Sequence, residues 1–173
     1  SENLKAILRA FERIGSVIIF PAHPRTRKAI AAQGLELAAN VRLIDPVGYL
    51  DMLQLQKNAR MILTDSGGIQ KEAYFLEVPC VTVRAETEWV ETVTAGWNRL
   101  VGADCDLIVH TVRSFAPPSV HPDLFGDGLA AEHIVSLLER SCWQMTGTTS
   151  ASTLRPMSQT LPRSAKGPAS GTS

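Results

Sequence analysis

The stretch from Met61 to Tyr74, MILTDSGGIQKEAY, decides the fold of this chain. Its first four residues, Met61 to Thr64, are apolar or β-branched and predict a buried strand, while a helical pattern starts at Ile69. Between them, the polar, glycine-rich run from Asp65 to Gly68 predicts a tight turn. Glycines in such a turn permit positive φ angles and a close approach of the backbone to a ligand. The stretch therefore predicts a strand, a turn and the N-terminus of a helix.

The N-terminus of this predicted helix is a candidate anion site. Its first amides have no intrahelical acceptor and carry the positive end of the helix dipole, so a phosphate fits there. Glu72 lies one helical turn beyond Gly68 on the same face, where we expect its carboxylate to accept hydrogen bonds from hydroxyls of the same ligand. Phosphate and diol together indicate a nucleotide. The alternative is structural: Asp65 or Ser66 caps the helix, and the glycines only form the turn.

The composition is that of one globular domain with no overall charge. With 173 residues and 45% hydrophobic content, the chain has enough apolar surface for one full core, and an α/β domain is the default. Residues 1–139 carry 13 basic and 17 acidic side chains, a net charge of −4, and the remainder carries +4. Because the body is acidic, we expect no nucleic acid among its partners.

The cysteines and the hydropathy indicate a reducing compartment. Cys80, Cys105 and Cys142 are odd in number, widely spaced and without a CxxC or Cys/His pattern, so we expect reduced thiols and no metal site. No apolar run reaches the ~18 residues of a membrane span, and the N-terminus lacks the pattern of a signal peptide. We therefore expect a soluble, cytoplasmic protein with no membrane partner.

Strands and helices alternate along residues 1–139. The chain opens on an amphipathic helix whose apolar positions are Leu4, Ile7, Leu8 and Phe11, and this abrupt start leads us to expect natural sequence upstream. The expected strands are 16–20, 41–44, 61–64, 79–83 and 99–101, and the further helices are 25–33, 48–59, 68–76, 89–95, 106–114 and 129–139. This order predicts right-handed βαβ crossovers and an α/β fold, with a Rossmann-like parallel sheet and helices on both faces.

The loop after the first expected strand holds a candidate acid. His23 and Arg25 follow this strand, and ligands of open parallel sheets bind beyond the carboxyl ends of strands. His23 is the best general-acid candidate in the chain, although a His in a proline-flanked loop is also an ordinary surface residue. Arg25 and Arg27 suit bidentate contacts to phosphate oxygens, and for Arg27 a solvated turn charge is the alternative.

The C-terminal segment differs from the body. Thirteen of the 33 residues in 141–173 are Ser or Thr, and acidic residues are absent from it. We therefore expect a domain over residues 1–139 and a disordered, Ser/Thr-rich tail over residues 140–173.

Further motifs accompany the stretch from Met61 to Tyr74. They are His23-Pro24, Leu43-Ile44-Asp45-Pro46 with Tyr49-Leu50, Leu63 to Gln70 with Glu72-Ala73, Thr87-Glu88, Ala95-Gly96, Leu100-Val101-Gly102 and Gly126-Asp127-Gly128. In order and spacing, residues 1–139 resemble the C-terminal half of the non-hydrolysing UDP-N-acetylglucosamine 2-epimerases. The resemblance implies the nucleotide-binding domain of a two-domain architecture of the glycosyltransferase-B type, whose N-terminal domain is missing here.

The resemblance also implies an activity. Members interconvert UDP-GlcNAc and UDP-ManNAc, or a related UDP-sugar, by eliminating UDP to give a 2-acetamidoglucal and adding it back with C2 inverted. It implies no cofactor, a place in cell-surface polysaccharide biosynthesis and, at full length, a homodimer. The implied UDP-binding residues are Ser66, Gly67 and Gly68 at the diphosphate, Glu72 at the ribose, Arg25 at the phosphate charge and Met52 at the uracil, with His23 as the implied catalytic residue beside the leaving group.

Two positions depart from the family pattern. Met52 stands where many members have an aromatic residue, and its thioether covers a base face less rigidly. Trp89 stands where many have Arg, so Arg25 or Arg84 is expected to supply that charge, and the substrate is expected to include modified UDP-sugars such as diacetamido uronic acid derivatives.

Other functions remain open at this stage. A nucleotide-sugar glycosyltransferase uses the same kind of cradle, and a non-catalytic UDP-binding fragment is a further alternative. The family carries its proton-abstracting carboxylates in the N-terminal half, and the run Glu86, Glu88 and Glu91 fits a solvated surface better than a replacement base. We therefore expect the isolated chain to be inactive.

Overall fold

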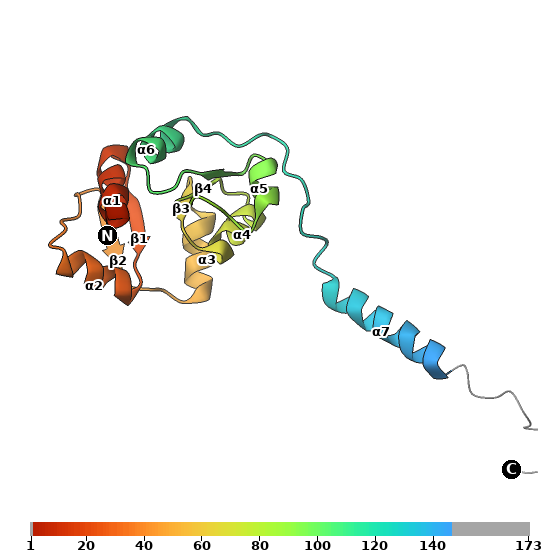
Figure 1. Cartoon of the computed structure of the whole chain (residues 1–173). Helices are drawn as coiled ribbons and strands as arrows, with labels where there is room; N and C mark the ends of the chain where they lie inside the picture. The colour runs from red at the N-terminus through yellow and green to blue at the C-terminus, as the bar shows by residue number, and fades with distance from the viewer. Residues whose placement is uncertain (1, 147–173) are drawn as a thin grey trace, which may run out of the picture. The chain divides into compact units, whose positions relative to one another are not determined.

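The protein is described by a computed structural model that covers residues 2–146 and contains two compact units, with the division after Gly126. Alternating helices and strands form the first unit (Figure 1). Their bounds are α1 (Glu2–Ile14), β1 (Ile18–Pro21), α2 (Pro24–Ala32), β2 (Val41–Ile44), α3 (Tyr49–Lys57), β3 (Ile62–Thr64), α4 (Gly67–Phe75), β4 (Cys80–Thr82), α5 (Val90–Thr94), β5 (Asn98–Leu100) and α6 (Cys105–Ser114). The predicted α/β fold class and the order of its elements are confirmed.

The five strands pair in parallel but form two sheets. β1 pairs with β2, and a separate sheet has the order β3-β4-β5. The expectation of one continuous sheet is therefore wrong for these residues, since the inner edges of β1 and β3 are not bonded to each other. β1 and β3 are the inner strands of the two sheets. From β1 the chain continues to β2, and from β3 it continues through β4 to β5.

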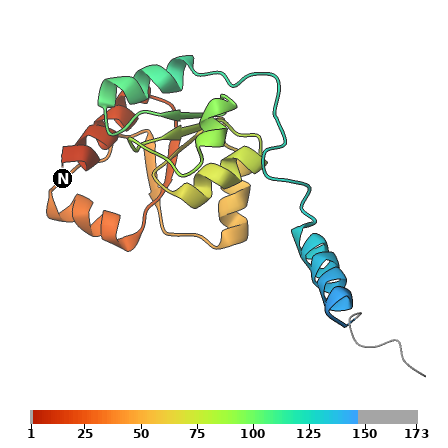
Figure 2. The same ribbon diagram turned by 45° about the vertical axis from the view of Figure 1, so that its right-hand side comes forward.

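Helices cover both faces of the β3-β4-β5 sheet. On one face α1 and α6 lie side by side, as the second view confirms (Figure 2), and Ala10, Ile108 and Val112 pack with Val81 of β4. On the other face α4 contributes Ala73 to a cluster with strand residues of β3 and β4. Burial of these apolar side chains is the main term that holds the layers together.

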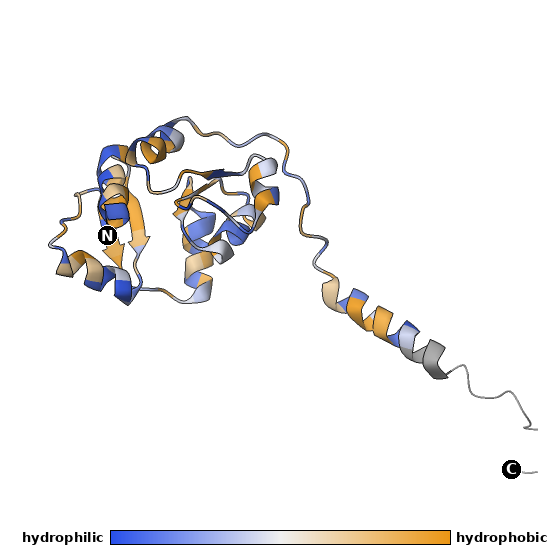
Figure 3. Ribbon diagram, in the orientation of Figure 1, coloured by the Kyte–Doolittle hydropathy of each residue, from blue (hydrophilic) through white to orange (hydrophobic). Residues whose placement is uncertain are grey.

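The β1-β2 sheet is covered on one face by α1 and α2. Leu8, Phe11 and Ile30 form a core cluster there, against which Ile18 and Phe20 pack. Both strands are largely hydrophobic, as Figure 3 shows, and the charged residue of β2, Arg42, is exposed. Gly15 has a φ of +76°, which lets the chain reverse between α1 and β1, as the sequence predicts for the end of this helix.

The second unit contains α7 (Ala130–Thr146). Before this helix, the Asp127 carboxylate accepts a hydrogen bond of 2.9 Å from the amide of Leu129. The helix extends beyond the expected end near Glu139, so residues 140–146 are helical and the expected boundary of the disordered tail is wrong for them. The rest of the predicted tail lies outside the described residues.

Candidate functional site

The N-terminus of α4 is open, as an anion site requires. Ser66 is the N-cap residue, but its hydroxyl makes no capping hydrogen bond. Its amide donates instead to Thr64 Oγ1 at 3.0 Å, which fixes the turn after β3. The first helical amides, at Gly67 and Gly68, therefore have no side-chain cap, and the alternative in which Ser66 serves only as a cap is not what the structure shows.

The two glycines at this N-terminus matter because they have no side chain, and not because they adopt a special backbone conformation. Gly67 and Gly68 are absent from the glycines with positive φ, so the expectation that they supply positive φ angles in the turn is wrong. They are already the first residues of α4. A Cβ on Gly67 would lie 3.1 Å from Glu88 Oε2 and 3.5 Å from Trp89 Nε1, whereas a Cβ on Gly68 would meet only Ser66 Oγ, at 3.8 Å. Glycine at position 67 therefore lets the side chains of Glu88 and Trp89 lie close to the backbone at the start of α4.

Trp89 holds the loop before α5 against this N-terminus. Its Nε1 donates a hydrogen bond of 2.8 Å to the carbonyl oxygen of Gly67, and its ring packs edge-on against Phe125 at 5.8 Å. The Lys71 ammonium lies 4.5 Å from the centre of the Trp89 ring, a cation–π distance. At the position where many relatives were expected to have arginine, this chain thus has a tryptophan that hydrogen-bonds to the backbone of α4.

The charged pair Arg84 and Glu88 lies beside Gly67. Arg84 donates to both carboxylate oxygens of Glu88, at 2.9 and 3.2 Å. These hydrogen bonds lower the pKa of Glu88 from its ordinary value and raise the pKa of Arg84. Of the two arginines expected to supply a phosphate contact, Arg84 is therefore already paired beside the α4 N-terminus. Arg25 is exposed.

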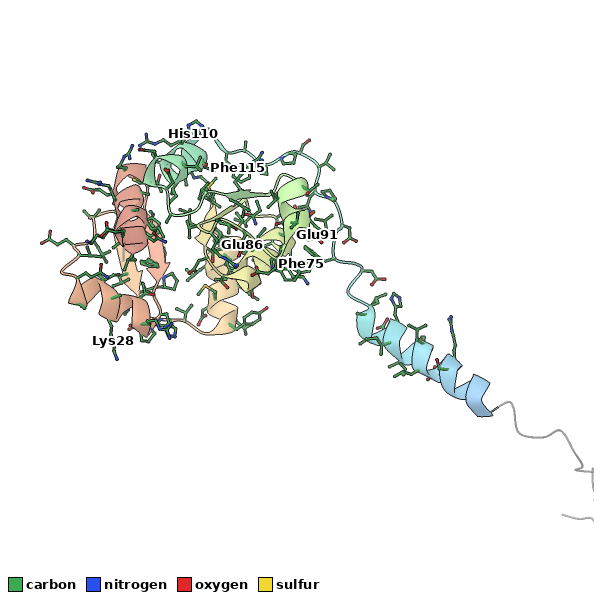
Figure 4. All side chains as sticks on the ribbon, in the orientation of Figure 1. Lys28, Phe75, Glu86, Glu91, His110 and Phe115 are labelled. Atoms are coloured by element: carbon green, nitrogen blue, oxygen red, sulfur yellow. The ribbon has the colours of Figure 1, made fainter. Side chains whose placement is uncertain are left out.

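The neighbouring acidic residues are solvated, as the sequence predicts. Glu86, Glu88 and Glu91 are all exposed, and Figure 4 marks the positions of Glu86 and Glu91. Exposed carboxylates of this kind fit a solvated surface better than the buried, oriented position of a general base.

Buried polar side chains connect α4 to β4, β5 and the loop before α5. Gln70 is fully buried, and its Oε1 accepts hydrogen bonds from Thr87 Oγ1 at 2.6 Å and from Asn98 Nδ2 at 3.1 Å. Asn98 Oδ1 in turn accepts a bond of 2.8 Å from Thr82 Oγ1. These bonds fix the first turn of α4 relative to β4, β5 and the loop that carries Thr87, although the buried Nε2 of Gln70 has no hydrogen-bond partner among the described residues.

Glu72 is held by a residue of a different helix. Gln56 of α3 is only 4% exposed, and its Nε2 donates a hydrogen bond of 2.6 Å to Glu72 Oε2. This bond fixes the carboxylate on the face of α4 on which the sequence places it. Met52 lies one turn earlier on α3 and is half-buried.

His23 is the N-cap residue of α2. Its Nδ1 accepts a hydrogen bond of 3.2 Å from the amide of Arg25, and Pro24 fills the first helical position, where no amide hydrogen is needed. An Nδ1 that accepts leaves the proton of the neutral ring on Nε2. Both His23 and Arg25 are exposed. Arg27 is in an ion pair with Asp45 at 3.2 Å.

A groove with a volume of about 880 Å³ runs along the length of β1 and β3 and reaches their carboxyl ends. At these ends it is lined by Pro21, Met52, Asp65 and Ser66. The strand order reverses here, so the groove opens at the position where α/β sheets bind ligands. Gln56 also lines it, whereas His23, Arg25 and Glu72 are not among the lining residues.

Metal and membrane features are absent from the described part of the chain. Within residues 2–146, no group of three or more His, Cys, Asp or Glu side chains is placed to hold a metal ion. No helix in that range is long and apolar enough to cross a membrane. Cys80 and Cys105 are free thiols, and the side chain of Cys142 lies outside the described set.

The fold and the open helix N-terminus together define a doubly wound α/β domain of the Rossmann-like class. Comparison with known families gives a more specific assignment. The model of the UDP-N-acetylglucosamine 2-epimerase family matches residues 1–139. The chain therefore belongs to the UDP-N-acetylglucosamine 2-epimerase family.

Individual relatives agree with this assignment. A UDP-N-acetylglucosamine 2-epimerase homolog from Methanococcus maripaludis is 50% identical over 142 residues, covering 79% of this chain and 40% of the relative. A UDP-2,3-diacetamido-2,3-dideoxy-D-glucuronate 2-epimerase from Pseudomonas aeruginosa is 48% identical over 143 residues, covering 80% of this chain and 40% of the relative. The chain thus spans about 40% of the length of these curated relatives.

A solved structure shows the same fold. The UDP-GlcNAc 2-epimerase from Methanocaldococcus jannaschii, in complex with UDP-GlcNAc and UDP, superposes with a TM-score of 0.72 at 40% identity. The match covers 80% of this chain and 41% of that structure. The predicted resemblance and the predicted fold class are both confirmed by these comparisons.

Several supporting residues were not identified by sequence analysis. Gln56, Gln70 and Trp89 contact the predicted site only through tertiary packing, and Trp89 was noted merely as a departure from the family pattern. A buried glutamine in a helix carries one usable sequence signal, because a polar residue on an otherwise apolar helical face requires a partner.

Proposed function

We propose that the complete protein is a non-hydrolysing UDP-sugar 2-epimerase and that this chain is its UDP-binding half. The proposed reaction interconverts UDP-GlcNAc and UDP-ManNAc, or a related UDP-sugar, by elimination and re-addition of UDP. The single observation that supports it most strongly is the uncapped N-terminus of α4 in a chain that belongs to this family. A departing diphosphate gains negative charge, and preorganised amides stabilise that charge as it develops.

UDP is proposed to bind along α4 and α3. The amides of Gly67 and Gly68, with the uncapped Ser66 hydroxyl, bind the diphosphate, because they are oriented donors at the positive end of a helix. Glu72 accepts from the ribose hydroxyls, and its bond to Gln56 keeps the carboxylate oriented before the nucleotide arrives. In the same proposal Met52 covers the uracil face, and Arg25 contributes charge near the phosphates.

His23 is proposed to act beside the leaving group. Because Nδ1 accepts from the Arg25 amide, the Nε2 hydrogen is available to donate to the leaving oxygen. His23 lies two residues beyond Pro21, which lines the groove at the end of β1. A donor at this place lowers the barrier to elimination only if its hydrogen bond strengthens as the UDP departs.

The substrate and the cellular context belong to the same proposal. The relative from Pseudomonas aeruginosa is named for a diacetamido uronic acid substrate, and this supports the inclusion of such modified UDP-sugars as substrates. We place the complete protein in the cytoplasm, as a homodimer that binds no nucleic acid and acts in cell-surface polysaccharide biosynthesis. The isolated chain is proposed to be inactive, because elimination needs a base at C2 and a cleft that excludes water.

The test follows hydrogen exchange at C2 in the complete protein. The protein is incubated in D₂O with UDP-GlcNAc and, separately, with the diacetamido glucuronate analogue, and deuterium entry at C2 is followed by NMR. Wild type should incorporate deuterium into at least one substrate, and His23→Asn should lose turnover much more than UDP affinity. Lys28→Gln, at an exposed position of α2, is the control. Deuterium entry into neither substrate, or full turnover in His23→Asn, would contradict the proposal.

A further inference from the structure

The Trp89 indole binds the peptide group that joins Gly67 to Gly68. Its Nε1 donates a hydrogen bond of 2.8 Å to the carbonyl oxygen of Gly67. This carbonyl and the Gly68 N–H belong to one planar trans peptide group, so they point in opposite directions. At the start of α4 the carbonyl points along the helix, and the amide points out of its N-terminus. The position of the indole therefore fixes the direction of the Gly68 amide.

The same hydrogen bond makes the Gly68 amide a better donor. A carbonyl that accepts a hydrogen bond polarises its peptide group, and successive bonds in such a chain strengthen one another. The Gly68 amide is one of the groups proposed above to bind the diphosphate. Trp89 thus acts on a proposed ligand-binding group through the backbone, at a position where many relatives were expected to carry a charge.

Two side chains hold the ring of Trp89, which lies in the loop before α5 and is only half-buried. Phe125 packs edge-on against it, with the ring centres 5.8 Å apart and the ring planes at 90°. The Lys71 ammonium lies 4.5 Å from the centre of the Trp89 ring and 4.7 Å from that of the Phe125 ring, so one cation contacts both rings. Edge-on aromatic pairs and cation–π contacts depend on the orientation of the rings. These contacts therefore favour the orientation in which Nε1 reaches the Gly67 carbonyl.

Phe125 is itself anchored to the first unit. The Tyr74 hydroxyl of α4 donates to the carbonyl oxygen of Pro122, and the Tyr74 ring packs edge-on against Phe125 at 5.5 Å. Trp97 Nε1 donates a hydrogen bond of 3.1 Å to the carbonyl oxygen of Val120. Tyr74 and Trp97 are both buried, so the segment that leads to Phe125 is fixed to the core. Phe125 is therefore a fixed contact for Trp89, although it lies in a loop beyond α6.

We propose that Phe125 and Lys71 are positioning residues for the diphosphate site. They hold the Trp89 indole on the Gly67 carbonyl and thereby direct the Gly68 amide out of the α4 N-terminus. For its ligand this assignment rests on the proposed function, whereas the orientation of the peptide group is a property of the free chain. The two parts are therefore measured separately.

The ¹⁵N-labelled 173-residue chain supplies two reporters, the indole N–H of Trp89 and the backbone amide of Gly68. The indole signal is assigned with Trp89→Phe. Because removal of a nearby ring changes the chemical shift of the indole directly, its rate of exchange with water is measured instead of its shift. For Gly68 the chemical shift of the amide proton is measured, since it reports the polarisation of the peptide group.

Four variants separate the aromatic contact, the cation and the general loss of a ring. Phe125→Leu removes the aromatic ring, and Phe125→Tyr retains it. Lys71→Met removes the ammonium but leaves the ring of Phe125 in place, so it gives an independent reading if Phe125→Leu lowers stability. Phe115→Leu is the matched control, because Phe115 is also a half-buried phenylalanine but packs against the core cluster of α1 and α6 (Figure 4).

In the free chain, Phe125→Leu and Lys71→Met should speed exchange of the Trp89 indole by about threefold or more and shift the Gly68 amide proton upfield. Phe125→Tyr and Phe115→Leu should leave both reporters as in wild type. Unchanged reporters in both Phe125→Leu and Lys71→Met would overturn the proposal. So would an equal change in Phe115→Leu, because the effect would then not depend on contact with Trp89.

Calorimetry on the complete protein tests the consequence for binding. Phe125→Leu alters no charge, and it should weaken UDP binding by about three- to tenfold while leaving uridine binding nearly unchanged. Wild-type UDP affinity in Phe125→Leu, with both reporters altered, would show that the Gly68 amide does not bind the diphosphate and would overturn the positioning role. A wild type that binds no UDP, with the free-chain changes present, would contradict the proposed function and leave the orientation of the peptide group by Phe125 and Lys71 supported.

Discussion

Replacing Gly67 by alanine separates the space requirement at the α4 N-terminus from a conformational one. Gly67 has no positive φ and is the first residue of the helix. Alanine is favoured over glycine by up to about 1 kcal/mol in a helix and reduces the entropy of the unfolded chain, worth about 0.4–1 kcal/mol. Both values largely reflect the same loss of backbone entropy and are not added, so the free energy of unfolding should rise by at most about 0.5–1 kcal/mol.

The new methyl group at position 67 has one tight contact. It would lie 3.1 Å from Glu88 Oε2, the far end of an exposed side chain that moves aside by a few tenths of an ångström. We therefore expect the free energy of unfolding of Gly67→Ala to lie between its wild-type value and about 1 kcal/mol above it. Gly68→Ala is the matched control, because its methyl would meet only Ser66 Oγ at an ordinary 3.8 Å.

Urea denaturation of the two variants measures this stability, and calorimetry with UDP on the complete protein measures affinity. Gly67→Ala should retain or gain stability and lose UDP affinity, because the methyl group takes space beside the amides proposed to hold the diphosphate. Gly68→Ala should gain stability as well. A loss of more than about 1 kcal/mol in Gly68→Ala would refute the helical, unstrained conformation of Gly68, and a similar loss in Gly67→Ala would refute the expectation that Glu88 moves aside.

The remaining predictions concern the supports of the site and one buried thiol. Gln56→Leu should cost about 1.5–3 kcal/mol in urea denaturation, since the Glu72 carboxylate loses its 2.6 Å donor, and an unchanged stability would remove that bond from the account. Trp89→Phe keeps an aromatic ring but loses the hydrogen bond to the Gly67 carbonyl, so the free energy of unfolding should fall by about 0.5–1.5 kcal/mol. A gain in stability, or a loss clearly above this range, would contradict the expectation. Burial raises the pKa of Cys80 from 9.0 to about 12, so between these values the folded state retains a proton that the unfolded state has lost. Stability should therefore fall with rising pH by at most about 1.4 kcal/mol per unit, and a Cys80→Ala variant with the same pH slope would show that the thiol is not its source.

The fold could be predicted from sequence because local signals and tertiary structure agree in this chain. The apolar runs at Val41 to Ile44 and at Met61 to Thr64 became strands within a residue of their expected bounds, and Gly15 ends α1 with a positive φ. The division into two sheets was not predictable, because periodicity identifies strands but does not show which strand lies beside which. The end of α7 was missed because the change in composition at Arg140 does not itself end a helix.

The candidate site was predicted in its local parts and missed in its tertiary parts. The strand, the turn and the helix N-terminus follow from a local motif, whereas sequence left open whether Asp65 or Ser66 caps the helix. The expected positive φ of the glycines was wrong, because α4 begins at Gly67, one residue before the expected bound. Gln56 bonds to Glu72, 16 positions along the chain, and Trp89 bonds to Gly67, 22 positions away. Such contacts depend on how the helices and loops pack, which a local sequence pattern does not show. The roles of the site residues in binding and catalysis stay predictions.

The central claim, that the α4 N-terminus is a diphosphate site, is tested most directly by NMR titration of the ¹⁵N-labelled chain with UDP. Uridine at the same concentrations is the control, because it has the base and ribose but no phosphate. The account predicts saturable shifts of the Gly67 and Gly68 amides with UDP, and much smaller ones with uridine, even if millimolar UDP is needed for a half-site. Unchanged Gly67 and Gly68 amides at saturating UDP, or equal shifts with uridine, would contradict it.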